Sequence, residues 1–177
     1  MVSTGVRRRP TLARAGAVLA AACLAAAGCT ADSSEPAEEI DWSTRVQACP
    51  NPGQPVIVQH VATGDVDGDR EPDTVVARTC EPSTSYWPST VEVFGSAEDK
   101  RRRLGVLLED VGATDRPWVT KVAVDNGTVV VEAYGVDETS EGNCADLNFT
   151  YRFRYAAGAF TREARDVGNA NKCQPVG

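Results

Sequence analysis

The hydrophobic residues after Cys49 fall mostly in short β-branched runs that are typical of β-strands, and this pattern restricts the fold more than any other feature of the chain. Short runs rich in Val, Ile and Thr are bounded by Gly, Pro, Asn and Asp, and no stretch keeps a helical period over three turns. We expect at most two short helices, over residues 97–103 and 162–167. Expected strands include residues 55–58, 74–77, 91–94 and 104–108.

The segment from Val119 to Tyr134 predicts a β-hairpin, because Asn126-Gly127 separates two valine-rich runs. A two-residue turn there gives one register, with an opposite-charge pair on one face and valine pairs on the other. The expected partners are Lys121 with Glu132, Val122 with Val131, and Val124 with Val129.

Residues 147–155 predict the next strand, with aromatic side chains on the face that we expect to enter the core. Phe149, Tyr151, Phe153 and Tyr155 form that face. We therefore expect a single all-β or β-rich domain over residues 49–177, with mainly antiparallel strands in a sandwich or a partly open barrel. Its 129 residues are enough for one hydrophobic core.

The first 28 residues predict a secretory signal peptide. Arginines at positions 7–9 precede an Ala-rich apolar run from Leu12 to Ala27, and no acidic residue occurs before Asp32. The apolar run is shorter than the roughly 20 residues that a membrane-spanning helix needs. We expect the mature chain to be exported.

The apolar run ends in Ala27-Gly28-Cys29, which resembles the bacterial lipobox. The resemblance implies that Cys29 becomes the N-terminus and carries acyl chains such as palmitate. Two acyl chains on one cysteine give stable membrane anchoring. The sequence departs from the motif at Ala26, where Leu is usual, and Cys23 fits the motif less well. The alternative is ordinary cleavage, which would leave Cys29 as a plain thiol.

Residues 29–48 predict a flexible acidic tether, because Ser, Pro and acids dominate and few apolar residues are available to bury. Within this segment, Trp42 is the first residue that we expect to contact the domain.

Charge restricts the partners of the exported chain. Without residues 1–28 it has 14 basic and 25 acidic residues, a formal net charge of −11. Such a chain is unsuited to nucleic acid and to anionic lipid, so we expect membrane attachment through the acyl chains only.

Arg outnumbers Lys 15 to 3, which is typical of a GC-rich bacterial genome. The chain resembles small actinobacterial lipoproteins of unassigned activity, which implies the outer face of the cytoplasmic membrane.

An acidic segment, residues 64–73, predicts a calcium site. Calcium binds six to eight oxygen ligands, and alternate residues of a tight loop can direct their oxygens at one centre. An EF-hand is excluded, because it needs Glu at position 12 of the loop and this chain has Val76 there. The alternative is a solvated acidic turn. The expected ligands are the side chains of Asp65, Asp67, Asp69 and Asp73 and the carbonyl oxygen of Glu71.

This segment resembles the calcium loop of FG-GAP and VCBS-type β-repeats, in which an Asp at position 9 closes an Asp-rich loop that leads into a strand. The four aspartates and Gly68 match that pattern, over about a tenth of the chain. Arg70 departs from it, because the family usually has Gly there and the position tends to need a positive φ. The chain has one such loop, so a multi-repeat propeller is not implied.

Four cysteines lie in the expected domain, and none are spaced as C-x-x-C, which argues against zinc or thioredoxin-like chemistry. An even number in an exported domain predicts two disulfides, with three possible pairings. We favour Cys80–Cys144 and Cys49–Cys173, because the second would join the two ends of the domain, and domain termini often lie close together.

Catalytic patterns are sparse. His60 is the one histidine, and no nucleophile motif accompanies it, so a hydrolase triad is not expected. We therefore expect a calcium-stabilised binding or scaffolding module rather than an enzyme. Its partner would be an unidentified protein or glycan, and Tyr86-Trp87-Pro88 is one candidate surface if it is exposed, the alternative being a loop packed onto the core. The alternative function is a calcium-dependent envelope hydrolase that acts on glycan through a carboxylate pair.

Overall fold

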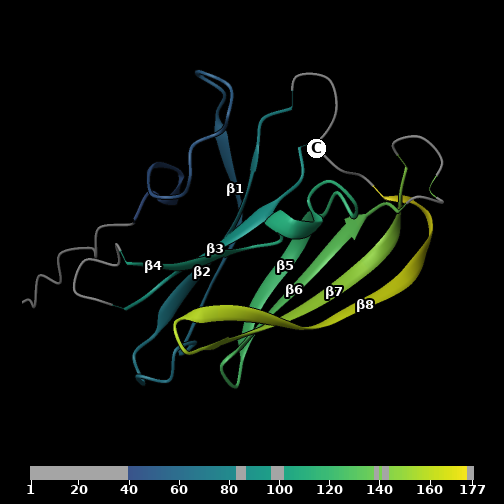
Figure 1. The fold of residues 1–177 in the computed structure, drawn as a ribbon. Coiled ribbons are helices and arrows are strands. Elements are labelled where there is room, and N and C mark those ends of the chain that lie inside the picture. The colour runs from purple at the N-terminus through teal and green to yellow at the C-terminus, as the bar shows by residue number, and fades with distance from the viewer. Residues whose placement is uncertain (1–39, 83–86, 97–101, 138–139, 141–143, 175–177) are drawn as a thin grey trace, which may run out of the picture. The chain divides into compact units, whose positions relative to one another are not determined.

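The computed structural model describes residues 40–82, 87–96, 102–137, 140 and 144–174. Within these residues the chain forms two four-stranded antiparallel sheets, which confirms the expected β-rich fold (Figure 1). The first sheet has the order β1 (Val56–Gly64), β2 (Asp73–Cys80), β3 (Thr90–Phe94) and β4 (Arg103–Leu107). The second has the order β5 (Trp118–Asp125), β6 (Thr128–Gly135), β7 (Ala145–Ala156) and β8 (Ala159–Gln174). Two short 3₁₀ turns are η1 (Trp42–Thr44) and η2 (Glu109–Val111).

The main core lies between the two sheets, because buried residues from both form one hydrophobic cluster. Val75 and Val93 enter it from the first sheet, and Val131 and Phe149 from the second. The strands β1 and β5 also contact each other, as do β4 and β8, so the sheets approach along both edges. This arrangement is a β-sandwich.

The expected hairpin register is confirmed. In β5 and β6, Lys121 pairs with Glu132, Val122 with Val131 and Val124 with Val129. The aromatic face of β7 is confirmed as core at Phe149, Tyr151 and Phe153, all of which are buried.

The expected helix over residues 162–167 is wrong, because this segment lies within the long strand β8. It pairs along its length with β7, from Ala145–Gln174 to Ala156–Ala159. Backbone N–H and C=O groups along the edge of β7 need partners, and this non-local pairing outweighs the local helix propensity. Most of the other expected helix, 97–103, lies outside the described residues, and β4 begins at Arg103.

Residues 40–49, which we call the N-terminal strap, pack against the outer face of the first sheet. Trp42 contacts the ring of Phe94, with ring centroids 5.3 Å apart, and Val46 is buried with Val76 and Phe94. The backbone N–H of Gln47 donates to the carboxylate of Glu92 at 2.7 Å. The boundary between tether and domain therefore lies before Trp42 rather than at Cys49, and the central strand β2 is covered on both faces.

Candidate metal centre

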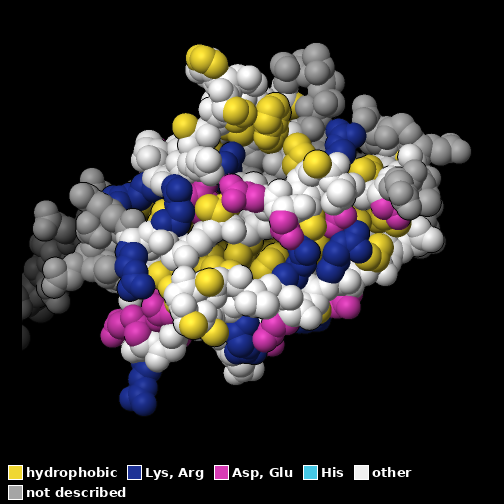
Figure 2. Space-filling view, viewed as in Figure 1, with side chains coloured by type: hydrophobic (Ala, Val, Ile, Leu, Met, Phe, Trp, Pro, Cys, Tyr) yellow, Lys and Arg dark blue, Asp and Glu magenta, His cyan; other side chains and the backbone are white. Residues whose placement is uncertain are grey.

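The acidic loop connects β1 to β2, and the pair Gly64–Asp73 closes its base. The loop reverses the chain over eight residues. Gly68 has a φ of 86° and Arg70 a φ of 74°, so the positive φ expected at position 70 is present on a non-glycine residue. In Figure 2 a group of acidic side chains is visible at the lower left, which is where this β1–β2 loop lies in Figure 1.

Side-chain hydrogen bonds to the backbone hold the first two aspartates. Asp65 accepts from the N–H groups of Gly68 at 2.7 Å and Arg70 at 3.1 Å, one on each carboxylate oxygen. Asp67 accepts from the N–H of Asp69 at 3.2 Å. These are the turn-forming contacts that Asp favours, and they fix the carboxylates within the loop before any ion binds.

Asp73 is completely buried at the start of β2. Its Oδ2 accepts from the N–H groups of Val66 at 2.8 Å and Asp67 at 3.2 Å, and its Oδ1 accepts from the N–H of Ser96 at 3.0 Å. Burial raises the pKa of this carboxyl group, and the negative charge of Asp67 adds to the rise. The three backbone donors act in the opposite direction, but the pKa remains above its usual value.

Three of the predicted ligands converge. One carboxylate oxygen from each of Asp65, Asp67 and Asp73 lies within 4.8 Å of the others, so this cluster can hold a metal ion. The donors are all hard oxygens, and such donors suit a hard divalent cation.

Asp69 lies outside that cluster in the structure. Its carboxylate accepts from the N–H of Glu71 at 2.8 Å and from the hydroxyl of Ser96 at 3.1 Å. Glu71 is exposed, and its carbonyl oxygen stays a prediction as a ligand. Ser96 follows β3, 27 residues from Asp69 along the chain, so spacing within the loop gave no signal for this contact.

A pocket of about 510 Å³ adjoins the loop. Asp65 and Asp67 line one side, and residues from the β5–β6 turn and the end of β7 line the other. The residues on that second side are Val124, Asn126, Gly127, Arg154 and Tyr155. These residues lie about 60 to 90 positions from the acidic loop along the chain, so no local pattern in the sequence connects them with it.

Comparisons with protein families, with curated proteins and with solved structures found no match to this chain.

The disulfides join Cys49 to Cys80 and Cys144 to Cys173, so the favoured pairing was wrong. Antiparallel pairing brings the start of one strand beside the end of its neighbour. Val56 at the start of β1 pairs with Cys80 at the end of β2, and the same relation holds between β7 and β8. Each bridge therefore lies at the end of one sheet, and none joins the two ends of the domain.

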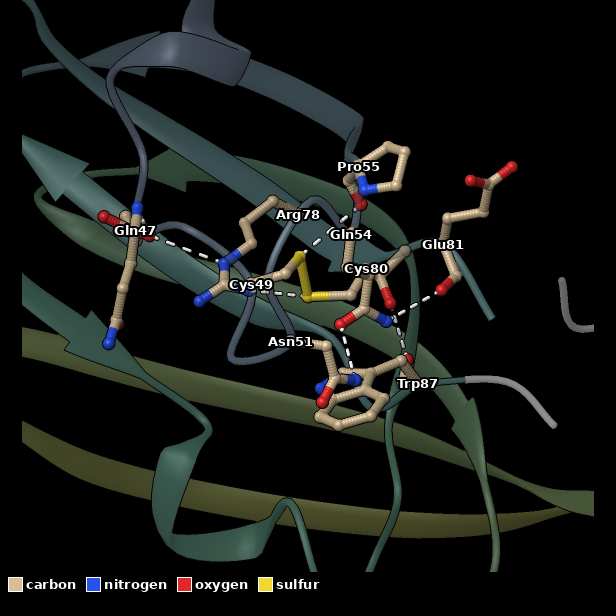
Figure 3. Close-up of a disulfide and its surroundings, with 11 residues drawn as sticks. Gln47, Cys49, Asn51, Gln54, Pro55, Arg78, Cys80, Glu81 and Trp87 are labelled. Atoms are coloured by element: carbon tan, nitrogen blue, oxygen red, sulfur yellow. Dashed lines mark hydrogen bonds and ion pairs between the residues drawn. A yellow bond between two sulfur atoms is a disulfide. The ribbon is translucent and has the colours of Figure 1, made fainter. Parts of the chain in front are cut away.

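Figure 3 shows the first bridge, which fastens the N-terminal strap to the end of β2. Cys80 is fully buried there, and a guanidinium N–H of Arg78 lies 3.4 Å from its sulfur. Nearby, the side-chain amide of Gln54 donates to the carbonyl of Glu81 at 2.8 Å, which joins the residues that follow Cys49 and Cys80. The surroundings are those of a structural crosslink.

His60 and Trp87 are not among the converging ligands. His60 lies in β1, opposite Ala77, and is half-buried. Cys29 and Tyr86 lie outside the described residues, whereas Trp87 is half-buried and its carbonyl accepts from the hydroxyl of Thr79 at 2.6 Å. Among the helices in the described part of the chain, none has the length and apolar character that a membrane crossing requires.

Proposed function

We propose that this chain is a lipid-anchored protein of the bacterial cell envelope, whose β-sandwich is stabilised by one calcium ion and acts as a binding or scaffolding module. The observation that carries the proposal is the convergence of the Asp65, Asp67 and Asp73 carboxylates in a loop that connects two core strands. Three carboxylates this close repel one another, and a divalent cation relieves that repulsion.

Calcium would be held by Asp65, Asp67 and Asp73, with the Glu71 carbonyl as a further ligand. The bound cation would neutralise the buried charge at the start of β2 and lock the β1–β2 connection. Its role would be structural, because Asp73 connects the loop to the end of β3 through Ser96 as well as closing the base of the loop.

The anchor part of the proposal is supported by Ala27-Gly28-Cys29, which follows an Arg-rich and Ala-rich leader. A lipidated Cys29 would leave residues 30–39 as the link to the strap. Fully extended, ten residues span at most about 35 Å, so the module would stay close to the membrane surface.

Thermal unfolding tests the calcium site. The full exported chain, with Cys29→Ser so that no acyl group is attached, is compared in calcium and in chelator. At 100 times its dissociation constant, calcium should add about 2.7 kcal/mol. Asp67→Ala should remove most of that gain, whereas Asp166→Ala, which removes an exposed charge from β8, should retain it. Identical melting curves in calcium and chelator would leave only a solvated acidic turn.

Intact mass of the wild-type chain extracted from membranes tests the anchor. The proposal requires a mature start at Cys29 with added acyl mass, and Cys29→Ser should abolish both. A mature N-terminus elsewhere with no lipid mass would reject the anchor while leaving the calcium result untouched.

A further inference from the structure

The pocket beside the acidic loop has two chemically different sides. Asp65 and Asp67 of the loop form one side, and Arg154 and Tyr155 at the end of β7 form part of the other. Its volume of about 510 Å³ lies within the range of small-molecule sites. A ligand in this pocket would therefore meet a guanidinium on one side and carboxylates on the other.

Two glycines bring the sides together. A Cβ on Gly64 would lie 2.6 Å from the Cβ of Val124, so β1 and β5 pack too closely there for a side chain. A Cβ on Gly127 would lie 3.8 Å from both the Nη1 of Arg154 and the carbonyl oxygen of Asp65. The Arg154 guanidinium and the backbone of the acidic loop therefore both lie beside one turn glycine.

Two of the three guanidinium nitrogens of Arg154 have hydrogen-bond partners in the described part of the chain. Its Nε donates to Glu163 at 2.9 Å and its Nη2 donates to the hydroxyl of Thr128 at 2.7 Å. Nη1 has no hydrogen-bond partner among the residues that the structure describes. Although Arg154 already pairs with Glu163, a guanidinium at a pocket wall is suited to bind a further carboxylate through its remaining nitrogen.

The loop side offers room for ligand oxygens. Calcium takes six to eight oxygen ligands. The three converging carboxylates and the predicted Glu71 carbonyl are fewer than that, and Asp69 is engaged by Ser96. Asp65 and Asp67 line the pocket and Asp73 does not, so the pocket adjoins the two half-buried carboxylates of the cluster. Neutral hydroxyl oxygens are suitable donors for such positions.

We propose that this pocket binds an acidic sugar of the uronic-acid type, with its carboxylate on Arg154 and its hydroxyl groups toward the metal-binding loop. Tyr155, which is half-buried and packs against Phe160 at 4.9 Å between ring centroids, also lines the pocket. Without a cation the loop carboxylates would repel the acid, so binding requires calcium. The inference thus rests on the proposed calcium site.

The test is titration calorimetry and amide NMR on the full exported chain with Cys29→Ser. The probes are methyl glucuronoside, methyl glucoside, which lacks the carboxylate, and glycerate, which lacks the ring. We expect saturable binding of the glucuronoside in calcium and none in chelator, with amide shifts at Asn126, Gly127 and Tyr155. The other two probes should bind at least tenfold more weakly.

Arg154→Met should weaken glucuronoside binding at least tenfold. The matched control is Arg152→Met, which also removes an exposed arginine of β7 that pairs with an acid of β8 but does not line the pocket. Melting temperatures of both variants establish that they are folded, and Arg154→Lys should recover part of the affinity because it keeps the charge.

The experiments distinguish failure of the sugar site from failure of the calcium site on which it depends. A chain that calcium stabilises but that shows no glucuronoside binding overturns the sugar site alone. Equal losses in Arg154→Met and Arg152→Met, binding that persists in chelator, or equal affinity for glycerate would each overturn it as well. Absence of any calcium effect on melting would instead overturn the proposed function from which the inference starts.

Discussion

Asp115 accepts two hydrogen bonds from Arg165, one on each carboxylate oxygen and each at 2.8 Å, although 50 residues separate them. The hydroxyl of Tyr151 donates to the same carboxylate at 2.8 Å. The guanidinium also lies over the ring of Phe149, 4.8 Å from its centroid. The contact joins the long strand β8 and the core strand β7 to the segment between η2 and β5.

Asp115→Ala should lower the free energy of unfolding by about 3 kcal/mol, because it leaves a buried tyrosine hydroxyl and a partly buried guanidinium without their acceptor. Urea denaturation at pH 7 measures the change. Asp166→Ala is the control, since it breaks an ion pair with Arg152 in which both side chains are exposed, and it should cost less than about 1 kcal/mol. Equal losses would mean that the Asp115 contact is no stronger than a surface pair.

The same carboxylate should make stability depend on pH. Burial by itself would raise the pKa of Asp115, but hydrogen bonds from Arg165 and Tyr151 and the charge of Arg165 outweigh it and hold the pKa below its usual value. A depressed pKa contributes stability that is present above the unfolded pKa, near pH 4, and is lost as pH falls through the folded pKa. The stability difference between wild type and Asp115→Asn should therefore be full at pH 6 and shrink below pH 4. A difference that is constant down to pH 2 would contradict this assignment.

Arg70→Gly should stabilise the loop, because Arg70 has a φ of 74° and glycine adopts that conformation without strain. The expected gain is about 1 kcal/mol, measured by denaturation in chelator so that ion binding does not contribute. Arg102→Gly is the matched control, since Arg102 is also exposed but is not among the positive-φ residues. A gain of the same size in both variants would show that the loss of an arginine side chain, and not the relief of backbone strain at a positive φ, is responsible.

Each disulfide should contribute about 3–4 kcal/mol, because the bridges span similar separations of 31 and 29 residues. Removal of either pair as a double Cys→Ser variant, followed by urea denaturation, measures this. Peptide mapping without reduction should recover Cys49 with Cys80 and Cys144 with Cys173. Recovery of Cys80 with Cys144 would contradict the strand arrangement as well as the pairing.

The features that the sequence predicted correctly depend on residues that lie close together along the chain. The Asn126-Gly127 turn fixes the β5–β6 register because two residues admit few turn geometries, and each pairing then follows by counting. Alternation in β7 placed Phe149 and Tyr151 in the core, since successive side chains of a strand point to opposite faces. The loop spacing likewise identified Asp65, Asp67 and Asp73 as a converging group, because all three belong to one short turn.

Tertiary structure alone decided the contacts that cross between segments. Pairing of β7 with β8 converted 162–167 from an expected helix into strand, and the antiparallel ends of neighbouring strands selected the cysteine partners. The hydroxyl of Ser96 donates to the carboxylate of Asp69, which lies outside the cluster of three aspartates. Packing of β1 against β5 places Arg154 and the acidic loop at the same pocket. Each of these contacts depends on which strands become neighbours, and that choice is made by burial of the shared core rather than by any local run of residues.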